Sequence, residues 1–237
     1  MRTAGWRSYV IYGCWVALCQ PLAACGSADT PSASTSDKAA ERTAPPIPAD
    51  APLVIAFGDS LYAGYQLGPK EGLAPQLQAA LGADGVVARV QNAGVSGDTT
   101  AAGRQRLTYV LDNAKVKPAL VVLGLGGNDM LRGIGPDQTR ANLDAMLAEL
   151  QKREIPVLLT GMMAAPNLGS DYATKFNPIY PELATKYAAS FYPFILDNVV
   201  TDKSLMLGDN LHPNAKGLKV VAEGLAPLVE QALPNAG

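Results

Sequence analysis

The 237-residue sequence is poor in the two residue types that most often bind zinc, because it has one histidine, His212, and three cysteines. Cys14 and Cys19 lie inside an apolar segment near the N-terminus, so removal of that segment would leave only Cys25. A single cysteine cannot form an internal disulfide bond. The same count excludes a structural zinc site built from thiolates and imidazoles. The sequence implies no metal ion and no organic cofactor.

An excess of charge of either sign is also absent. The chain has 19 lysines and arginines against 21 aspartates and glutamates, which gives a formal net charge of −2, and its basic residues form no run. Nucleic acids and anionic membrane surfaces attract proteins through such runs. We therefore expect no nucleic-acid partner and no polybasic membrane patch, and the sequence leaves the oligomeric state open. A composition of 48% hydrophobic and 17% charged residues is typical of a globular core.

The N-terminal apolar stretch is too short for a membrane span. Tyr9–Ala24 follows Arg2 and Arg7 and is interrupted by Gln20 and Pro21. A spanning helix needs roughly 20 apolar residues, whereas a positive start followed by a shorter apolar segment is typical of a signal peptide. We interpret residues 1–25 as such a peptide.

The end of this segment, Leu22-Ala23-Ala24-Cys25, is similar to the bacterial lipobox, in which the cysteine is lipidated and becomes the new N-terminus. This predicts an exported protein with a lipid anchor on Cys25, held on the periplasmic side of the envelope or on an outer membrane if the cell has one. Ordinary cleavage after a small residue is the alternative and would give a soluble periplasmic or secreted protein. Residues 26–52 are rich in Ala, Ser, Thr and Pro, which predicts a flexible tether before a domain at 53–237.

From Leu53 onward, short apolar runs alternate with segments of helical spacing. The expected strands are 53–57, 86–91, 120–123, 156–160 and 191–196. The expected helices are 72–81, 100–114, 136–153, one within 170–189, and 213–233 with Pro213 in its first turn. Strands that alternate with helices predict a parallel sheet covered on both faces. The fold class is therefore α/β, a three-layer αβα arrangement with a flavodoxin-like, five-stranded parallel sheet.

Four polar blocks follow the predicted strands or precede the last predicted helix. They are 57–61 (FGDSL), 92–98 (NAGVSGD), 126–129 (GGND) and 209–213 (DNLHP). The carboxyl ends of parallel strands meet at one edge of a sheet, where α/β proteins bind their ligands. We therefore expect all four blocks to meet there.

The residue types in these blocks are those that acyl transfer requires. A serine hydroxyl becomes nucleophilic when an imidazole accepts its proton, so we assign Ser60 as nucleophile and His212 as base. Asp209 lies three residues before His212 and can orient its ring. The backbone N–H groups of Ser60 and Gly94 and the side-chain amide of Asn128 are candidates for an oxyanion hole.

In this order the blocks resemble the signature of the SGNH/GDSL hydrolase superfamily, whose name lists Ser, Gly, Asn and His. The resemblance covers residues 53–233 and is closest to the bacterial arylesterase, acyl-CoA thioesterase and lysophospholipase branch, on segments 58–65, 96–99 and 126–133. It implies hydrolysis of carboxylic esters or thioesters through an acyl-enzyme on Ser60. Because the sequence shows no long apolar lid segment, we expect short to medium acyl chains. Met162 and Met163 depart from the more polar loop of these relatives and either border the acyl pocket or pack in the core.

Alternative functions stay open at this point. The same triad would serve a lysophospholipase or a carbohydrate O-deacetylase. A lipid-anchored binding protein without turnover is the alternative from another class. Several other polar residues in or near the blocks also have two interpretations. We favour loop bracing for Asp59, Asp98 and Asp129, and a solvated surface rather than anionic head-group binding for Arg104, Arg106 and Arg132.

Overall fold

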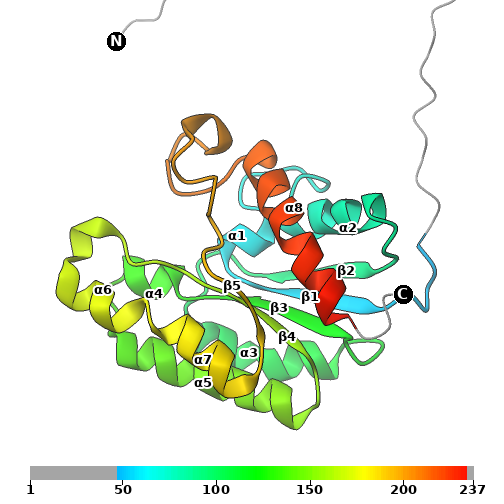
Figure 1. The fold of residues 1–237 in the computed structure, drawn as a ribbon, viewed down its shortest axis with the longest axis horizontal. Helices are drawn as coiled ribbons and strands as arrows, with labels where there is room; N and C mark the ends of the chain where they lie inside the picture. The colour runs from blue at the N-terminus through cyan, green and yellow to red at the C-terminus, as the bar shows by residue number, and fades with distance from the viewer. Residues whose placement is uncertain (1–46, 234–237) are drawn as a thin grey trace, which may run out of the picture. The chain divides into compact units, whose positions relative to one another are not determined.

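A computed structural model describes residues 47–233 of the chain. Its centre is one sheet of five parallel strands in the order β2-β1-β3-β4-β5 (Figure 1). The strands are β1 (Leu53–Gly58), β2 (Arg89–Gly94), β3 (Leu120–Gly124), β4 (Val157–Thr160) and β5 (Ser190–Tyr192). The strand order reverses between β1 and β3, which is where open α/β sheets bind ligands. The predicted fold class is confirmed.

The helices connect successive strands and cover both faces of the sheet. They are α1 (Ser60–Ala63), α2 (Leu73–Ala83), α3 (Thr100–Asp112), α4 (Gly127–Leu131), α5 (Pro136–Lys152), α6 (Ser170–Phe176), α7 (Ile179–Tyr187) and α8 (Ala215–Ala232), with short 3-10 turns at Pro166–Leu168 and Lys203–Leu205. Helices α2 and α8 pack on one face, and α3, α5 and α7 pack on the other (Figure 1). No helix within residues 47–233 has the length and apolar character to cross a membrane.

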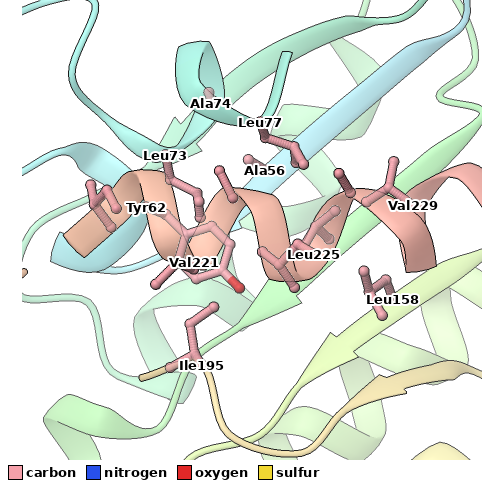
Figure 2. Close-up of a cluster of buried hydrophobic side chains, with 14 of the residues drawn as sticks. Ala56, Tyr62, Leu73, Ala74, Leu77, Leu158, Ile195, Val221, Leu225 and Val229 are labelled. Atoms are coloured by element: carbon pink, nitrogen blue, oxygen red, sulfur yellow. The ribbon is translucent and has the colours of Figure 1, made fainter. Parts of the chain in front are cut away.

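Each face of the sheet has its own hydrophobic core, because side chains of a strand alternate between the two faces. In β1, Val54 and Ala56 contact the α2 and α8 side, whereas Ile55 and Phe57 contact the α3 and α5 side. Every residue of β1 is buried, as a strand covered on both faces requires. Figure 2 shows the core between the sheet and helices α2 and α8, where Leu225 of α8 packs over the sheet.

The ends of several elements differ from the sequence prediction. Strand β5 stops at Tyr192 rather than 196, because Pro193 has no N–H with which to extend the ladder. The last helix begins at Ala215, where the Asn214 side chain accepts hydrogen bonds from the first helical N–H groups. Pro213 lies before that cap and pairs with Met206 in an isolated bridge.

The boundary of the domain also differs slightly from the prediction. Ala51, which we placed in the tether, is buried, and its carbonyl accepts a hydrogen bond of 3.2 Å from Arg89 Nε. The last residues of the predicted tether therefore pack against the domain. The predicted signal peptide and the tether up to residue 46 lie outside the described residues.

Candidate active site

The predicted nucleophile lies at a tight turn between β1 and α1. Gly58 ends the strand, and a side chain there would collide with the Tyr62 ring and the Gly124 carbonyl, at 2.1–2.5 Å from a Cβ atom. Asp59 then caps α1, since its Oδ1 accepts a hydrogen bond of 3.1 Å from Leu61 N. Ser60 is the first residue of the helix and is partly exposed. The close packing of Gly58 thus presents the Ser60 hydroxyl at the carboxyl edge of the sheet.

The structure brings Ser60, His212 and Asp209 into one line. Ser60 Oγ lies 2.9 Å from His212 Nε2, and His212 Nδ1 lies 2.7 Å from Asp209 Oδ2. When Nδ1–H donates to the carboxylate, Nε2 carries the lone pair that can accept the serine proton. The Tyr65 ring packs against the imidazole with centroids 4.4 Å apart. The geometry is therefore that of a serine activated by an imidazole whose orientation is fixed by Asp209.

Asp209 is held in its ionised form by the turn that contains it. Its Oδ1 accepts hydrogen bonds from the backbone N–H of His212 at 3.0 Å and of Leu211 at 2.9 Å. The bond from the His212 backbone, followed by the bond from the His212 ring, lowers the pKa of the Asp209 carboxyl to about 2. Asn210, with φ of 54°, supplies the sharp bend between carboxylate and base. At neutral pH, Asp209 is a carboxylate and can stabilise an imidazolium.

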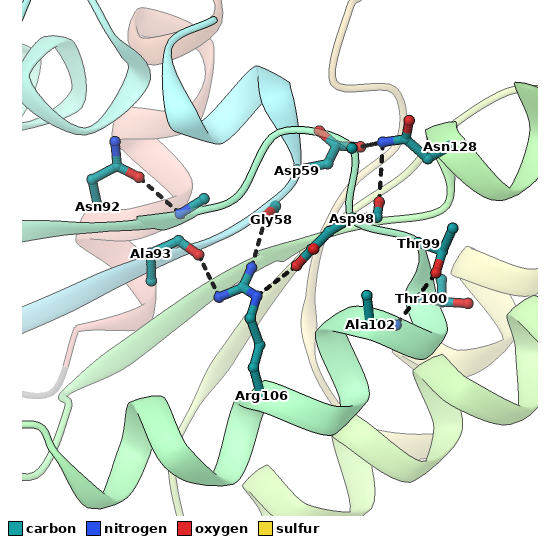
Figure 3. A network of polar contacts seen from close by, with 12 residues as sticks. Gly58, Asp59, Asn92, Ala93, Asp98, Thr99, Thr100, Ala102, Arg106 and Asn128 are labelled. Carbon is teal, nitrogen blue, oxygen red and sulfur yellow. Dashed lines mark hydrogen bonds and ion pairs between the residues drawn. The ribbon is translucent and has the colours of Figure 1, made fainter.

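The structure corrects one part of the predicted oxyanion hole. Gly94 lies within β2, and its N–H donates a hydrogen bond of 2.8 Å to Asn92 Oδ1 (Figure 3). Gly94 does not line the pocket that contains Ser60. It is glycine for a packing reason, because a Cβ atom there would lie 2.2 Å from Ala63 N. The Gly94 N–H is thus engaged elsewhere and cannot serve an oxyanion at Ser60.

Gly97, three residues later, lines the Ser60 pocket together with Asn128. Its φ of 86° is the left-handed conformation that glycine adopts without strain. Among residues 47–233, the N–H groups of Gly97 and Ser60 donate to no protein acceptor. Two N–H groups are therefore available at the nucleophile. The signal for Gly97 was present in the sequence as a second glycine in the same block.

Asn128 is held beside these groups by two oxygen atoms. Its Nδ2 donates to the Asp98 carbonyl at 3.0 Å and, over a longer distance of 3.4 Å, to Asp59 Oδ2 (Figure 3). The shorter bond fixes the direction of the amide, and the weaker bond leaves its second hydrogen easily redirected. Burial raises the pKa of the Asp59 carboxyl to about 6. Asp59 is thus a cap and a neighbour of Asn128 rather than a partner of His212.

A pocket of about 650 Å³ opens beside the triad. Besides site residues, its wall consists largely of apolar side chains from helix α4 and four loops, namely Tyr65, Met130, Leu131, Met162, Met163, Ala164, Ala165, Pro166, Phe194, Leu196, Val200 and Leu211. Among residues 47–233, no lysine or arginine lines this pocket. Both interpretations of the methionine pair hold in part, because Met162 also packs against both cores while Met163 is half exposed. The pocket suits an uncharged, apolar group next to Ser60.

Comparison with known proteins places this site in a family. Residues 56–220 match the GDSL-like lipase/acylhydrolase family. The chain belongs to this family. Esterase TesA of Pseudomonas aeruginosa is 36% identical over 185 residues, which are 78% of this chain and 91% of the relative. An arylesterase of Vibrio mimicus is 36% identical over 173 residues, 73% and 86% of the two chains. The crystal structure of AlinE4, an SGNH-hydrolase family esterase, is 48% identical, covers 78% of this chain and 98% of its own, and superposes with a TM-score of 0.67.

These relationships confirm the predicted family and the prediction that the chain is an ester-hydrolysing enzyme. Within residues 47–233 of this GDSL acylhydrolase, no three His, Cys, Asp or Glu side chains are placed to hold a metal ion together.

The remaining polar residues in and near the blocks differ in their burial and in their hydrogen-bond partners. Asp129 is fully buried and accepts hydrogen bonds from Thr100 and Thr139, as a loop-bracing residue should. Arg104 is exposed and bonds only Asn142 at 3.3 Å, in agreement with a solvated surface. Arg132 is exposed but donates to the Gly97 carbonyl at 2.7 Å.

Arg106 contradicts the expectation of a solvated surface. Its side chain is only 20% exposed and lies below the carboxyl ends of β1 and β2. There it pairs with Asp98 and donates to the carbonyls of Gly58 and Ala93 (Figure 3). Sequence position alone could not reveal this, because the acceptors come from two separate blocks, 57–61 and 92–98, that meet Arg106 only in the fold.

Proposed function

We propose that this enzyme hydrolyses carboxylic esters or thioesters in which the group bound beside Ser60 is an uncharged, apolar aryl or short to medium acyl group, through an acyl-enzyme on Ser60. The observation that carries the proposal is the line Ser60–His212–Asp209 at the mouth of an apolar pocket without lysine or arginine. An apolar pocket recognises its ligand by the surface that it removes from water, and so favours hydrocarbon groups over charged ones.

In the first half of the reaction, Ser60 Oγ attacks the substrate carbonyl carbon while its proton passes to His212 Nε2. The carboxylate of Asp209 stabilises the imidazolium that forms. The carbonyl π-electron pair moves to the oxygen, which becomes an oxyanion. Collapse of this tetrahedral intermediate breaks the bond to the leaving alcohol or thiol, which takes the proton from His212. The product is an ester between Ser60 and the acyl group.

In the second half, water attacks the acyl-enzyme and gives its proton to His212 Nε2. A second tetrahedral intermediate collapses, the carboxylic acid leaves, and the proton returns to Ser60 Oγ. Each intermediate carries its negative charge on the former carbonyl oxygen. We assign the N–H groups of Ser60 and Gly97 and the Asn128 amide as the donors to this oxygen. Such donors contribute most when they are fixed before the charge develops.

The alternatives fit the pocket less well. A carbohydrate O-deacetylase needs polar side chains to bind sugar hydroxyls, whereas the wall beside Ser60 is mainly apolar. A binding protein without turnover would not need the 2.9 Å contact between Ser60 and His212. A lysophospholipase activity is compatible with an apolar acyl group and lies within the proposal as a choice of substrate.

The proposal is tested by treating the purified protein with an alkyl fluorophosphonate and measuring the intact and peptide masses. One adduct on Ser60 is expected, with no adduct in Ser60→Ala and strongly slowed labelling in His212→Ala. In parallel, p-nitrophenyl esters from acetate to decanoate and the matching acyl-CoA thioesters report substrate class. A folded protein that neither labels nor hydrolyses any of these compounds would overturn the proposal and favour the binding protein.

We further propose that Cys25 is lipidated and holds the enzyme at the bacterial envelope. The support is the Leu22–Cys25 pattern after a positive and apolar N-terminal segment. Esters and thioesters with apolar acyl groups partition into membranes, so an anchored enzyme would act where such substrates are concentrated.

A further inference from the structure

One guanidinium group, that of Arg106 in α3, lies at the junction of the segments that form the active site. Nη2 donates to the Gly58 carbonyl at 2.9 Å, and Nη1 donates to the Ala93 carbonyl at 2.8 Å. Nε forms an ion pair of 2.5 Å with Asp98, whose side chain is 12% exposed. The face of the guanidinium packs on the Phe57 ring, 3.9 Å from its centroid. Figure 3 shows Gly58, Ala93 and Asp98 gathered at the guanidinium end of Arg106.

Two of these contacts, those with Gly58 and Asp98, lead to the proposed oxyanion donors. Gly58 lies two residues before Ser60, at the start of the nucleophile turn. Asp98 directly follows Gly97. The Asp98 carbonyl, in turn, accepts the 3.0 Å hydrogen bond that orients the Asn128 amide. One side chain thus connects the supports of all three donors.

We propose that Arg106 is a positioning residue that sets the spacing of the three oxyanion donors, acting on them through Gly58 and Asp98. The inference rests on the proposed function of Ser60, Gly97 and Asn128. Arg106 does not line the substrate pocket, so it acts without touching the substrate. A guanidinium suits this role because its N–H groups point outward in one rigid plane and can bind several oxygens at fixed angles. The low exposure of Arg106 and Asp98 strengthens their charge-assisted bond.

Donor spacing matters most when negative charge has developed on the substrate oxygen. A substrate in its ground state gains little from the donors, whereas the tetrahedral intermediate depends on them. Loss of Arg106 geometry should therefore lower kcat and leave KM nearly unchanged. Substitution of a residue needed only for folding would instead lower the thermal stability and the fraction of active enzyme. The molecules that remain active would keep the wild-type kcat and KM.

The test compares Arg106→Lys with Arg104→Lys, a matched change two residues away on the exposed side of the same helix. An ammonium group keeps the charge of Arg106 but cannot reach the three acceptors in their fixed directions. We expect Arg106→Lys to lower kcat about 10- to 100-fold, with KM within about twofold of the wild-type value. Active-site titration with the fluorophosphonate corrects kcat for inactive protein, whereas KM does not depend on the concentration of active enzyme. Arg104→Lys should match the wild type.

A second variant and a second readout complete the test. If Arg106→Lys does not fold, Asp98→Asn weakens the same ion pair more gently, and a several-fold loss of kcat at constant KM is expected. Amide NMR spectra of the full chain add a measurement without turnover, in which Arg106→Lys should shift the Ser60 and Gly97 backbone N–H signals and the Asn128 side-chain signals. Unshifted signals, or equal changes of kcat in both lysine variants, would overturn the positioning role. A wild-type protein without esterase activity would overturn the proposed function alone, because the NMR comparison would still stand.

Discussion

At the scale of single residues, Asp59 combines burial with a position beside the nucleophile. Its side chain is 4% exposed, and removal from water raises the pKa of its carboxyl to about 6. Unfolding would return this carboxyl to an ordinary pKa of about 3.9. Between these two values, the folded protein holds a proton that the unfolded chain has lost. The free energy of unfolding therefore decreases as the pH rises from about 4 to 6.

Asp59→Asn should remove the pH-dependent contribution of Asp59 to the free energy of unfolding. It should keep the helix cap, because an asparagine Oδ1 can still accept a hydrogen bond from Leu61 N. Relative to the wild type, the free energy of unfolding of the variant should rise by up to about 3 kcal/mol between pH 4 and pH 7. Urea denaturation at pH 4, 5, 6 and 7 measures this difference. Asp84→Asn, at an exposed position, controls for the change in net charge. A difference between Asp59→Asn and wild type that does not vary with pH would contradict the prediction.

At the scale of elements, strand β2 and the loop that follows it each contain a glycine, and the two glycines have different roles. Gly94 ends the strand, where α1 approaches so closely that only a hydrogen atom fits. Gly97 lies in the loop with a positive φ and open space around it, the nearest atom to a Cβ being Arg132 Nη2 at 3.4 Å. Both glycines belong to one sequence block, so the block predicts a glycine donor without indicating which one.

Alanine at each position should distinguish these tasks. Gly94→Ala places a Cβ against the α1 backbone and should lower the free energy of unfolding by about 3 kcal/mol or more. Gly97→Ala strains the loop by about 1–2 kcal/mol and turns its N–H, so kcat should fall about tenfold or more at a similar KM. Thermal denaturation and steady-state kinetics on a p-nitrophenyl ester measure both effects. A folded Gly94→Ala enzyme of normal stability that had lost only kcat would restore Gly94 to the oxyanion hole.

At the scale of the whole molecule, the enzyme joins two distant parts of its chain. Ser60 and His212 are 152 residues apart in the sequence, yet Ser60 Oγ and His212 Nε2 lie 2.9 Å apart, because β1 lies between β2 and β3 and the loop before α8 returns over the carboxyl edge of the sheet. The predicted anchor on Cys25 concerns the same scale, since it decides where the whole domain acts.

Cys25→Ser should move the protein from the membrane to the soluble fraction, because a hydroxyl group cannot accept the thioether-linked lipid. Fractionation of cells followed by immunodetection measures the partition, and a mass spectrum of the wild-type N-terminal peptide identifies the lipid. The serine variant should keep wild-type esterase activity in the soluble fraction, since residue 25 precedes the described domain. Unchanged partitioning would contradict the anchor.

The sequence by itself determined the alternation of strands and helices and the types of residue that perform the chemistry. Apolar periodicity records which faces of a segment are buried, and that information lies in consecutive residues. The single histidine, with an aspartate three residues before it, left one candidate base. These features needed no knowledge of distant contacts.

Only the tertiary structure decided which glycine of the block lines the Ser60 pocket and that Arg106 is enclosed rather than solvated. Both depend on segments that strand pairing brings together, Gly58 beside Gly94 and the loop of Asp98 beside Asn128. A hydrogen-bond partner is determined by distance and direction in space. Neither can be read from the sequence when the two residues lie far apart in the chain and become neighbours only in the fold.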